Sequence, residues 1–311
     1  MTSLAAIASF HPPHRVSIAD YLSRHGVDEA QTKVYERYYG FSEIRIAEGM
    51  GFAEQMLAAA ARLAELPRVR HRIRYVIQAR TMPIAAPYPT NPLHAVRSAL
   101  GLAHATAFCL NQQACASGLL AVEVAGRLLE RDGDPEALAL IFVGEKTFTS
   151  SAQVLSFTAV MGESTAAVLV APGDGPDTVL SYASQIHGRY YLGPRMPAEL
   201  QNQFADGYAD ALAEVIRAAL DGAGLAIDDI KLILPHHVNR MSWVRVLRKL
   251  GIRGGDRLFL DNLASTGHCF AADPFLNRET AGEKGRLRSG DRYVMTSVGL
   301  GATFSAMVLS C

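Results

Sequence analysis

Short apolar runs alternate with longer amphipathic stretches along the whole chain, and this alternation predicts an α/β protein. We predict strands over Leu4–Ser9, Arg72–Gln78, Ala105–Leu110, Leu138–Gly144, Ala166–Ala171, Val179–Ile186, Lys231–Pro235, Leu258–Leu260, Arg292–Ser297 and Thr303–Leu309. The stretches between them that are long enough for helices are Met50–Leu66, Ala116–Glu130, Phe204–Leu220, Trp243–Leu250 and Phe275–Arg286.

The segment Ala171–Asp177 divides the chain into two similar parts. It carries two prolines, two glycines and two aspartates between predicted strands, which is the composition of a turn. Each part ends in a glycine-containing turn and an apolar strand, MGESTAAVLVAP and VGLGATFSAMVLS. Each also has a Cys- or His-bearing segment before a helix, ACASGLL and TGHCFAAD. We therefore predict two α/β halves, residues 1–172 and 178–311, with these segments facing each other where the halves meet.

Charge and composition exclude several classes of protein. Lysine plus arginine number 30 and aspartate plus glutamate number 30, a balance that argues against a nucleic-acid or polybasic membrane binder. The longest apolar run, Ala137–Val143, is far shorter than the roughly 20 residues of a membrane span. The first residues lack the basic region of a secretory signal. We expect a soluble, cytoplasmic protein.

Cys115 is the cysteine whose surroundings indicate chemistry. It follows the predicted strand ATAFCL and opens a helix rich in Leu, Val and Ala. At a helix N-terminus the unpaired amides and the helix dipole favour the thiolate, which is the nucleophilic form. The small side chains of Ala114, Ala116, Ser117 and Gly118 leave room for an acyl group. These features predict a nucleophile, whereas the chain's four scattered cysteines, with no CxxC pair, predict neither a disulfide framework nor a zinc site.

Segments in both halves resemble the β-ketoacyl-ACP synthase III (ketosynthase III) branch of the thiolase superfamily. ACASGL resembles its nucleophile turn, and GESTAAVLV its Gly-Asp-Gly-Ala-type hairpin. PHHVN (Pro235–Asn239) resembles its His-Gln-Ala-Asn segment, and STGHCFAADP (Ser265–Pro274) its Gly-Asn-Thr-Ser-Ala segment. SVGLGATFSAMVL resembles its C-terminal glycine-rich loop and closing strand. The resemblance covers essentially the whole chain, and it implies a thiolase-like fold in which two similar halves form five layers.

The same resemblance implies roles for particular residues. Cys115 would carry the acyl group, and His236 would be the catalytic histidine. His268 stands where the family has asparagine, which turns a Cys-His-Asn set into Cys-His-His, as in the elongating ketosynthases. The backbone amides of Cys115 and of the Leu300–Gly301 turn would form the oxyanion hole. A second departure, His237 in place of glutamine, is expected to be structural.

Binding residues are expected in two further segments. Tyr88, Thr90 and Asn91 lie in a proline-rich stretch, Thr81–Val96, which in the family lines the neighbouring subunit's acyl pocket; a plain surface connection explains it equally well. Beside the His236 segment, Asn239 and a basic run would face an acidic acyl carrier protein, whose association such charges steer. The alternative is a solvated helix face. The basic residues expected in this role are Arg240, Arg248 and Lys249.

We expect Cys115 to take an acyl group from acyl-CoA or an acyl carrier protein and to condense it with a malonyl-type thioester in fatty acid, polyketide or other secondary-metabolite biosynthesis. His236 and His268 would donate hydrogen bonds to the malonyl carbonyl as carbon dioxide leaves. No metal or redox cofactor is needed, and the resemblance implies a homodimer paired through Ala105–Leu110. Two alternatives stay open: acyl transfer to an alcohol or amine without decarboxylation, and a non-catalytic partner subunit. The sequence leaves the acyl donor, the acceptor and the pathway undetermined.

Overall fold

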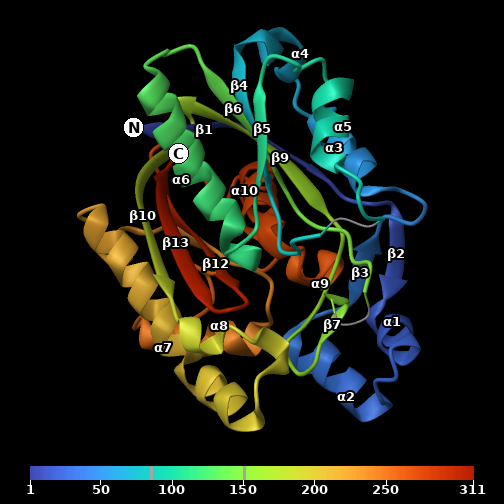
Figure 1. Cartoon of the computed structure of the whole chain (residues 1–311). Coiled ribbons are helices and arrows are strands. Elements are labelled where there is room, and N and C mark those ends of the chain that lie inside the picture. Colours follow the sequence, from blue (N-terminus) through green and yellow to red (C-terminus); the bar gives the residue numbers. More distant parts are fainter. Residues whose placement is uncertain (85–86, 150–151) are drawn as a thin grey trace.

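The computed structural model describes residues 1–84, 87–149 and 152–311, and strands from both ends of the chain form one mixed sheet at its centre (Figure 1). The order across this sheet is β11-β12-β13-β10-β1-β9-β6-β4-β5, while β2 pairs with β3 and β7 with β8. The strands are β1 (Thr2–Phe10), β2 (His14–Ser17), β3 (Glu43–Ile46), β4 (Ile73–Ala79), β5 (Thr106–Leu110), β6 (Leu138–Val143), β7 (Val154–Leu155), β8 (Ala159–Val160), β9 (Thr165–Pro172), β10 (Thr178–Ile186), β11 (Leu232–Leu234), β12 (Arg292–Gly299) and β13 (Thr303–Ser310).

The strand pairing repeats between the two parts of the chain. In the first, β4 runs parallel to β6, β6 pairs with β9 in the antiparallel sense, and β9 pairs with β1 in the same sense. In the second, β11 runs parallel to β12, and the pairs β12–β13 and β13–β10 are antiparallel. The two sets meet at a short contact between β1 and β10, where Thr2 pairs with Val179 and Ser3 with Thr178. The domain limits at residues 172 and 178 stay a prediction.

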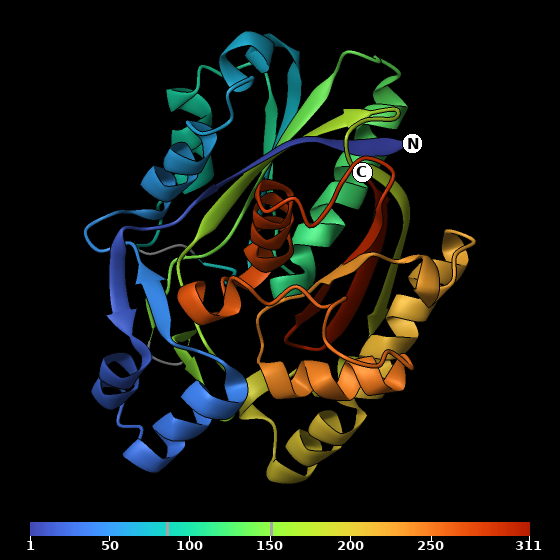
Figure 2. The same cartoon turned by 180° about the vertical axis from the view of Figure 1, so that it is seen from behind.

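Helices fill three layers around the two sets of strands. The helices are α1 (Ile18–Arg24), α2 (Glu29–Val34), α3 (Phe52–Ala60), α4 (Leu66–Val69), α5 (Pro92–Ala99), α6 (Ser117–Asp132), α7 (Ala198–Gly222), α8 (Arg240–Lys249), α9 (Leu263–Thr266) and α10 (Asp273–Glu283). One apolar cluster joins α6 and α10 to strands of both sets, a second packs α7 and α8 on β11–β13, and a third packs α3 and α5 on β4, β6 and β9. Figures 1 and 2 show α6 and α10 side by side in the middle of the molecule. The predicted five-layered arrangement of two similar halves is confirmed.

The central helix α6 follows its sequence pattern closely. Leu119, Val122, Ala125 and Leu129 recur at helical spacing, and all four are buried. The helix ends at Gly133, whose φ of 68° is the left-handed conformation that glycine adopts without a steric cost. This buried helix therefore fixes the position of the short turn that precedes it, Ala114–Ala116.

Two predicted elements differ in the structure. Leu258–Leu260 is not a strand: Leu258 forms one isolated bridge with Ile233, and the run is too short to continue before the chain turns into α9. The helix predicted over Met50–Leu66 is interrupted, and its sequence continues as the separate α4. Helix α3 ends at Ala60, and Pro67 lies in the first turn of α4, a position where the missing N–H of proline breaks no helical hydrogen bond.

The region before Cys115 also differs from its prediction. The stretch Thr81–Val96 was expected to be a loop, but α5 starts within it at Pro92, where Asn91 accepts a hydrogen bond from the His94 amide at 3.1 Å. Ala85 and Ala86 of that stretch lie outside the described residues. The hairpin β2–β3 and the helices α1 and α2 were not predicted from the sequence. Within the described residues, no helix combines the length and the apolar character that crossing a bilayer requires.

The strand β5 lies at one edge of the sheet, paired on one side only, with β4. An edge strand presents unpaired backbone groups that another chain can pair with. We expect a homodimer formed through this edge, so sedimentation at micromolar concentration should give twice the chain mass of 33.5 kDa. A mass that stays at 33.5 kDa over that concentration range would show that the edge is not used in this way.

Candidate active site

Cys115 lies in a short 3₁₀ turn, Ala114–Ala116, immediately before α6, and its side chain is buried. The second half of the chain holds this turn. The hydroxyl of Ser297 in β12 donates to the carbonyl oxygen of Cys115 at 2.7 Å. A Cβ on Gly299 would lie 1.8 Å from the carbonyl oxygen of Gln113, so only glycine permits this approach. Ala114 has a φ of 46°, an unfavourable conformation for alanine, which indicates that its surroundings impose it.

A third segment reaches Cys115 from the end of β4. The hydroxyl of Thr81 donates to the Cys115 sulfur at 3.4 Å. The buried carboxylate of Glu145 holds this segment, because it accepts from the amides of Thr81 and Met82 and pairs with Arg80 at 2.9 Å. The sequence analysis did not single out Thr81 as a site residue, since a threonine in a loop carries no distinguishing signal.

His268 lies next to Cys115, in the loop between α9 and α10. Its backbone is fixed between the carbonyl of Val160 and the amide of Gly162, at 2.8 and 2.9 Å. Its Nδ1 hydrogen-bonds Oδ2 of Asp273, and the ring also hydrogen-bonds Cys115. Because Nδ1 is occupied by the carboxylate, Nε2 is the ring nitrogen left for the cysteine. Burial lowers the pKa of His268, but the charges of Asp273 and Cys115 outweigh it and raise the pKa to about 10.

Asp273 is the first residue of α10 and is fully buried. Its oxygens also accept from the backbone amides of His237 and Cys269, at 2.6 and 2.7 Å. Burial raises the pKa of Asp273, but the neighbouring histidines, His237 and then His268, lower it by more. The pKa therefore lies below its ordinary value, and the carboxyl is ionised. The structure thus places a nucleophile, an imidazole and a carboxylate in a row, as in the hydrolases that use a Ser-His-Asp or Cys-His set. Sequence reasoning missed Asp273, although its place just after His268 at the start of a helix was a usable signal.

His236 follows β11 and lies beside His268, with 6.2 Å between the ring centroids. Its amide donates to the carbonyl of Thr296 at 3.1 Å, and its carbonyl accepts from the indole of Trp243 at 3.0 Å. Its Nε2 hydrogen-bonds the hydroxyl of Tyr208 on α7 at 2.6 Å, while its buried Nδ1 has no partner among the described residues. Burial, and then the charge of His268, lower the pKa of His236 to about 3, so its ring is neutral.

The three residues predicted to be catalytic, Cys115, His236 and His268, therefore come together in one buried cluster. The predicted oxyanion residues Leu300 and Gly301 form the turn between β12 and β13, next to the Gly299 that touches the nucleophile turn. Their role, like that of the three side chains, stays a prediction.

The predicted binding residues have mixed surroundings. Asn239 is buried, where it caps α8 through the Ser242 amide at 2.8 Å and donates to Thr158. Lys249 pairs with Asp210 at 2.7 Å, and Arg240 and Arg248 are exposed on α8. Tyr88 and Thr90 are exposed as well, and Asn91 caps α5. These contacts give Asn239, Asn91 and Lys249 structural functions, and the binding roles of all seven residues stay predictions.

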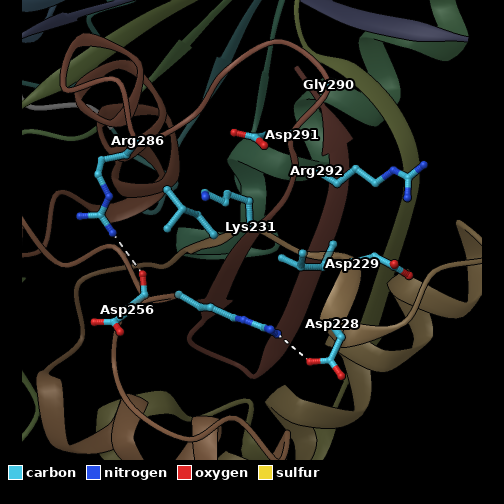
Figure 3. Close-up of a pocket in the computed structure, with 11 residues that line it drawn as sticks. Asp228, Asp229, Lys231, Asp256, Arg286, Gly290, Asp291 and Arg292 are labelled. Carbon is cyan, nitrogen blue, oxygen red and sulfur yellow. Dashed lines mark hydrogen bonds and ion pairs between the residues drawn. The ribbon is translucent and has the colours of Figure 1, made fainter.

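A separate surface cleft of about 550 Å³ lies at the start of β11 and β12, at the end of β11 opposite to His236 (Figure 3). Acidic and basic side chains alternate along it, and ion pairs such as the one between Arg257 and Asp228, at 3.0 Å, use part of that charge. None of the residues that line it belongs to the Cys115 cluster. Among the described residues, no group of three or more His, Cys, Asp or Glu side chains is arranged to hold a metal ion.

Comparisons with known proteins agree with this fold. A family model described as 3-oxoacyl-[acyl-carrier-protein (ACP)] synthase III C terminal matches residues 220–311. Beta-ketoacyl-[acyl-carrier-protein] synthase III of Roseiflexus castenholzii is 30% identical over 295 residues, which cover 87% of either chain. The solved 3-oxoacyl-[acyl-carrier-protein] synthase III of Aquifex aeolicus is 20% identical and superposes with a TM-score of 0.82 over 100% of both chains. The solved structure "ChlB3 [Aceyltransferase]" is 17% identical, with a TM-score of 0.86 over 99% of this chain and 97% of that one.

Five layers, repeated strand pairing and a cysteine turn before a central helix define a protein of thiolase-like fold, and the related synthases indicate an enzyme that transfers acyl groups. Within that class, the chain belongs to the β-ketoacyl-acyl-carrier-protein synthase III family. The family predicted from the sequence is confirmed. The Cys-His-His set, with His268 in place of asparagine, stays a prediction.

Proposed function

We propose that the protein moves an acyl group from a thioester to Cys115 and then to a hydroxyl or amine acceptor, without decarboxylation. The row of Asp273, His268 and Cys115 carries this proposal. A carboxylate that holds Nδ1 of an imidazole leaves Nε2 free to move protons, which acyl transfer to O–H or N–H acceptors requires. Hydrogen-bond donation to an enolate does not need such a carboxylate.

In the first step, the Cys115 thiolate attacks the thioester carbonyl, and the amides of Cys115 and of the Leu300–Gly301 turn stabilise the oxyanion. The carrier thiolate leaves and takes a proton from His268. Loss of the cysteine charge in the acyl-enzyme removes one of the two charges that raise the pKa of His268, so the ring becomes an effective base. The acceptor gives its proton to Nε2, its oxygen or nitrogen attacks the acyl carbon, and Cys115 leaves as thiolate. No step needs a metal or redox cofactor, which stays an expectation.

Acyl-CoA or an acylated carrier protein would supply the acyl group, as the names of the related synthases suggest. The exposed Arg240 and Arg248 on α8 would attract an acidic carrier protein. Tyr88, Thr90 and Asn91 would contribute to a pocket in a dimer.

Decarboxylative condensation with a malonyl-type thioester is the second candidate, and the identity of the curated relatives favours it. It needs donors from both His236 and His268 to one thioester carbonyl. The hydroxyl of Tyr208 already occupies Nε2 of His236, which weighs against this candidate. A non-catalytic partner subunit would have no use for the buried Asp273–His268 pair.

Carbon dioxide release and acyl transfer, measured in parallel on the wild-type enzyme, test the proposal. We expect Cys115 to be acylated and the acyl group to pass to small alcohols or amines, with no carbon dioxide from malonyl-CoA. Release of carbon dioxide at the rate of product formation would favour condensation instead.

Replacing Tyr208 with phenylalanine should make malonyl-CoA decarboxylation measurable, where the wild-type enzyme releases no carbon dioxide. The change removes only the hydroxyl, so Nε2 of His236 becomes free to bind a thioester carbonyl. Labelled carbon dioxide trapped from [3-¹⁴C]malonyl-CoA measures the effect. Tyr190, which is also on the α7 side of the core, provides a matched control as Tyr190→Phe. An equal rise in both variants, or none in Tyr208→Phe, would mean that the tyrosine does not block His236.

A further inference from the structure

The two positions at which this chain departs from the family pattern contact the same carboxylate. His268 stands in place of asparagine, and its Nδ1 bonds Oδ2 of Asp273. His237 stands in place of glutamine, its amide donates to the same Oδ2 at 2.6 Å, and its ring Nδ1 lies 3.3 Å from Oδ1. All three side chains are buried, and those of His237 and Asp273 are fully so.

The oxygen nearest to each ring nitrogen of His237 can only accept. The hydroxyl of Thr266 lies farther from Nδ1, at 3.5 Å, and it donates to the carbonyl oxygen of Asn262 at 2.9 Å. Nδ1 lies 3.0 Å from the carbonyl oxygen of Gly267, besides its contact with Asp273. Nε2 lies 2.9 Å from Oδ1 of Asn277. The orientation of the Asn277 amide is fixed, because its Nδ2 donates to the carbonyl oxygen of Pro235 at 2.8 Å. A neutral imidazole has one N–H and would leave a lone pair against one of these oxygens in a site without water access.

We propose that His237 carries a proton on both ring nitrogens and serves as the fixed counter-ion of Asp273, which makes it a positioning residue for His268. The inference rests on the proposed function in one respect, namely that His268 acts as the base. An imidazolium satisfies both acceptors and pairs with the carboxylate, whereas a buried carboxylate next to one titrating histidine would be compensated only part of the time.

The counter-ion has a consequence for His268. A positive charge beside Asp273 weakens the hold of the carboxylate on the His268 proton, so His268 releases that proton at a lower pH than it otherwise would. Both His237 and His268 lower the pKa of Asp273. The titratable groups that act on this cluster are Cys115, His236, Cys269, Asp273 and His11.

Nitrogen-15 NMR of the histidine-labelled full-length protein tests the protonation directly. At pH 7 we expect both ring nitrogens of His237 to show the chemical shifts and bonded protons of an imidazolium. A non-protonated ring nitrogen at that pH would overturn the inference. This measurement needs no substrate and no variant, so it decides even if the variant below does not fold.

The variant His237→Gln tests the effect on His268. Glutamine fits the space and is the family's residue, but it carries no charge. We expect the NMR titration of His268 to move upwards by about one pH unit, and the acidic limb of acyl transfer to move with it. A purely structural role would change rates without moving either midpoint. His25→Gln, which removes a partly buried histidine that bonds Tyr21 and Gln153 away from the site, is the control and should move neither.

The outcomes separate the two proposals. An unmoved His268 titration in His237→Gln overturns the counter-ion role. If the wild-type enzyme transfers no acyl group but the His268 titration moves, the proposed function fails and the counter-ion role stands.

Discussion

Cys115→Ala is expected to abolish acyl transfer, with a loss of at least about 10⁴-fold, and to leave the protein folded. The acyl-enzyme cannot form without the sulfur. The change removes one buried atom, so the thermal midpoint should shift by only a few degrees. Intact-protein mass spectrometry after mixing with acyl-CoA should show one acyl adduct on the wild-type enzyme and none on the variant.

Cys269→Ala is the matched control, since Cys269 is equally buried and lies on the other side of His268 in the chain. Burial, and then the charge of Asp273, raise the pKa of its thiol, so it is not a nucleophile at neutral pH. This variant should keep the adduct and the activity. An adduct that persists in Cys115→Ala and disappears in Cys269→Ala would show that Cys269, and not Cys115, carries the acyl group.

His268→Asn is expected to reduce acyl transfer to an alcohol or amine by about 10³-fold, because an amide cannot take the proton of the acceptor. Formation of the acyl-enzyme should suffer less, since the amide still donates a hydrogen bond near Cys115. Single-turnover assays that follow acylation and transfer separately measure the two effects. His268→Ala should lose both steps more fully.

The same variant separates the two candidate reactions. If the enzyme condensed malonyl thioesters, asparagine would restore the usual family set and measurable carbon dioxide release would remain, with a flatter pH profile because only imidazole titrates near neutrality. His236→Asn is the comparison. In the transfer mechanism it should retain more activity than His268→Asn, and the reverse order would contradict the assignment of His268 as the base.

The site could be predicted from the sequence where its residues lie in short motifs. Cys115, His236 and His268 each follow a strand or precede a helix in a recognisable segment, and the structure brings all three together. Asp273 belongs to the same segment as His268, but an aspartate at the start of a helix is also a common helix-terminal residue, and only the fold turns its carboxylate onto the imidazole. Tyr208 had no local signal, since a tyrosine in an amphipathic helix looks like any core residue until the packing of α7 places its hydroxyl on His236.

Most elements of the fold could be predicted from patterns of apolar residues. The elements that could not be predicted in this way differ for physical reasons. The continuous apolar run of β6 and the apolar residues at helical spacing in α6 can be recognised in the sequence, because burial requires apolar side chains at these positions. Leu258–Leu260 is equally apolar, but a run of that length takes its conformation from its neighbours, and one bridge to Ile233 is all it makes. The small β2–β3 hairpin depends on pairing between segments far apart in the chain, which no local window contains.

The contact of Ser297 and Gly299 with the Cys115 turn has a consequence for the timing of reactivity during synthesis. A growing chain exposes Cys115 long before β12 has been made, and His268 and Asp273 also come much later. Until then the thiol has neither its base nor the strand that shapes its turn, so it has the ordinary reactivity of an unactivated cysteine. In the proposed mechanism, Cys115 therefore gains both its base and the support of its turn only when the second half of the chain docks onto the first.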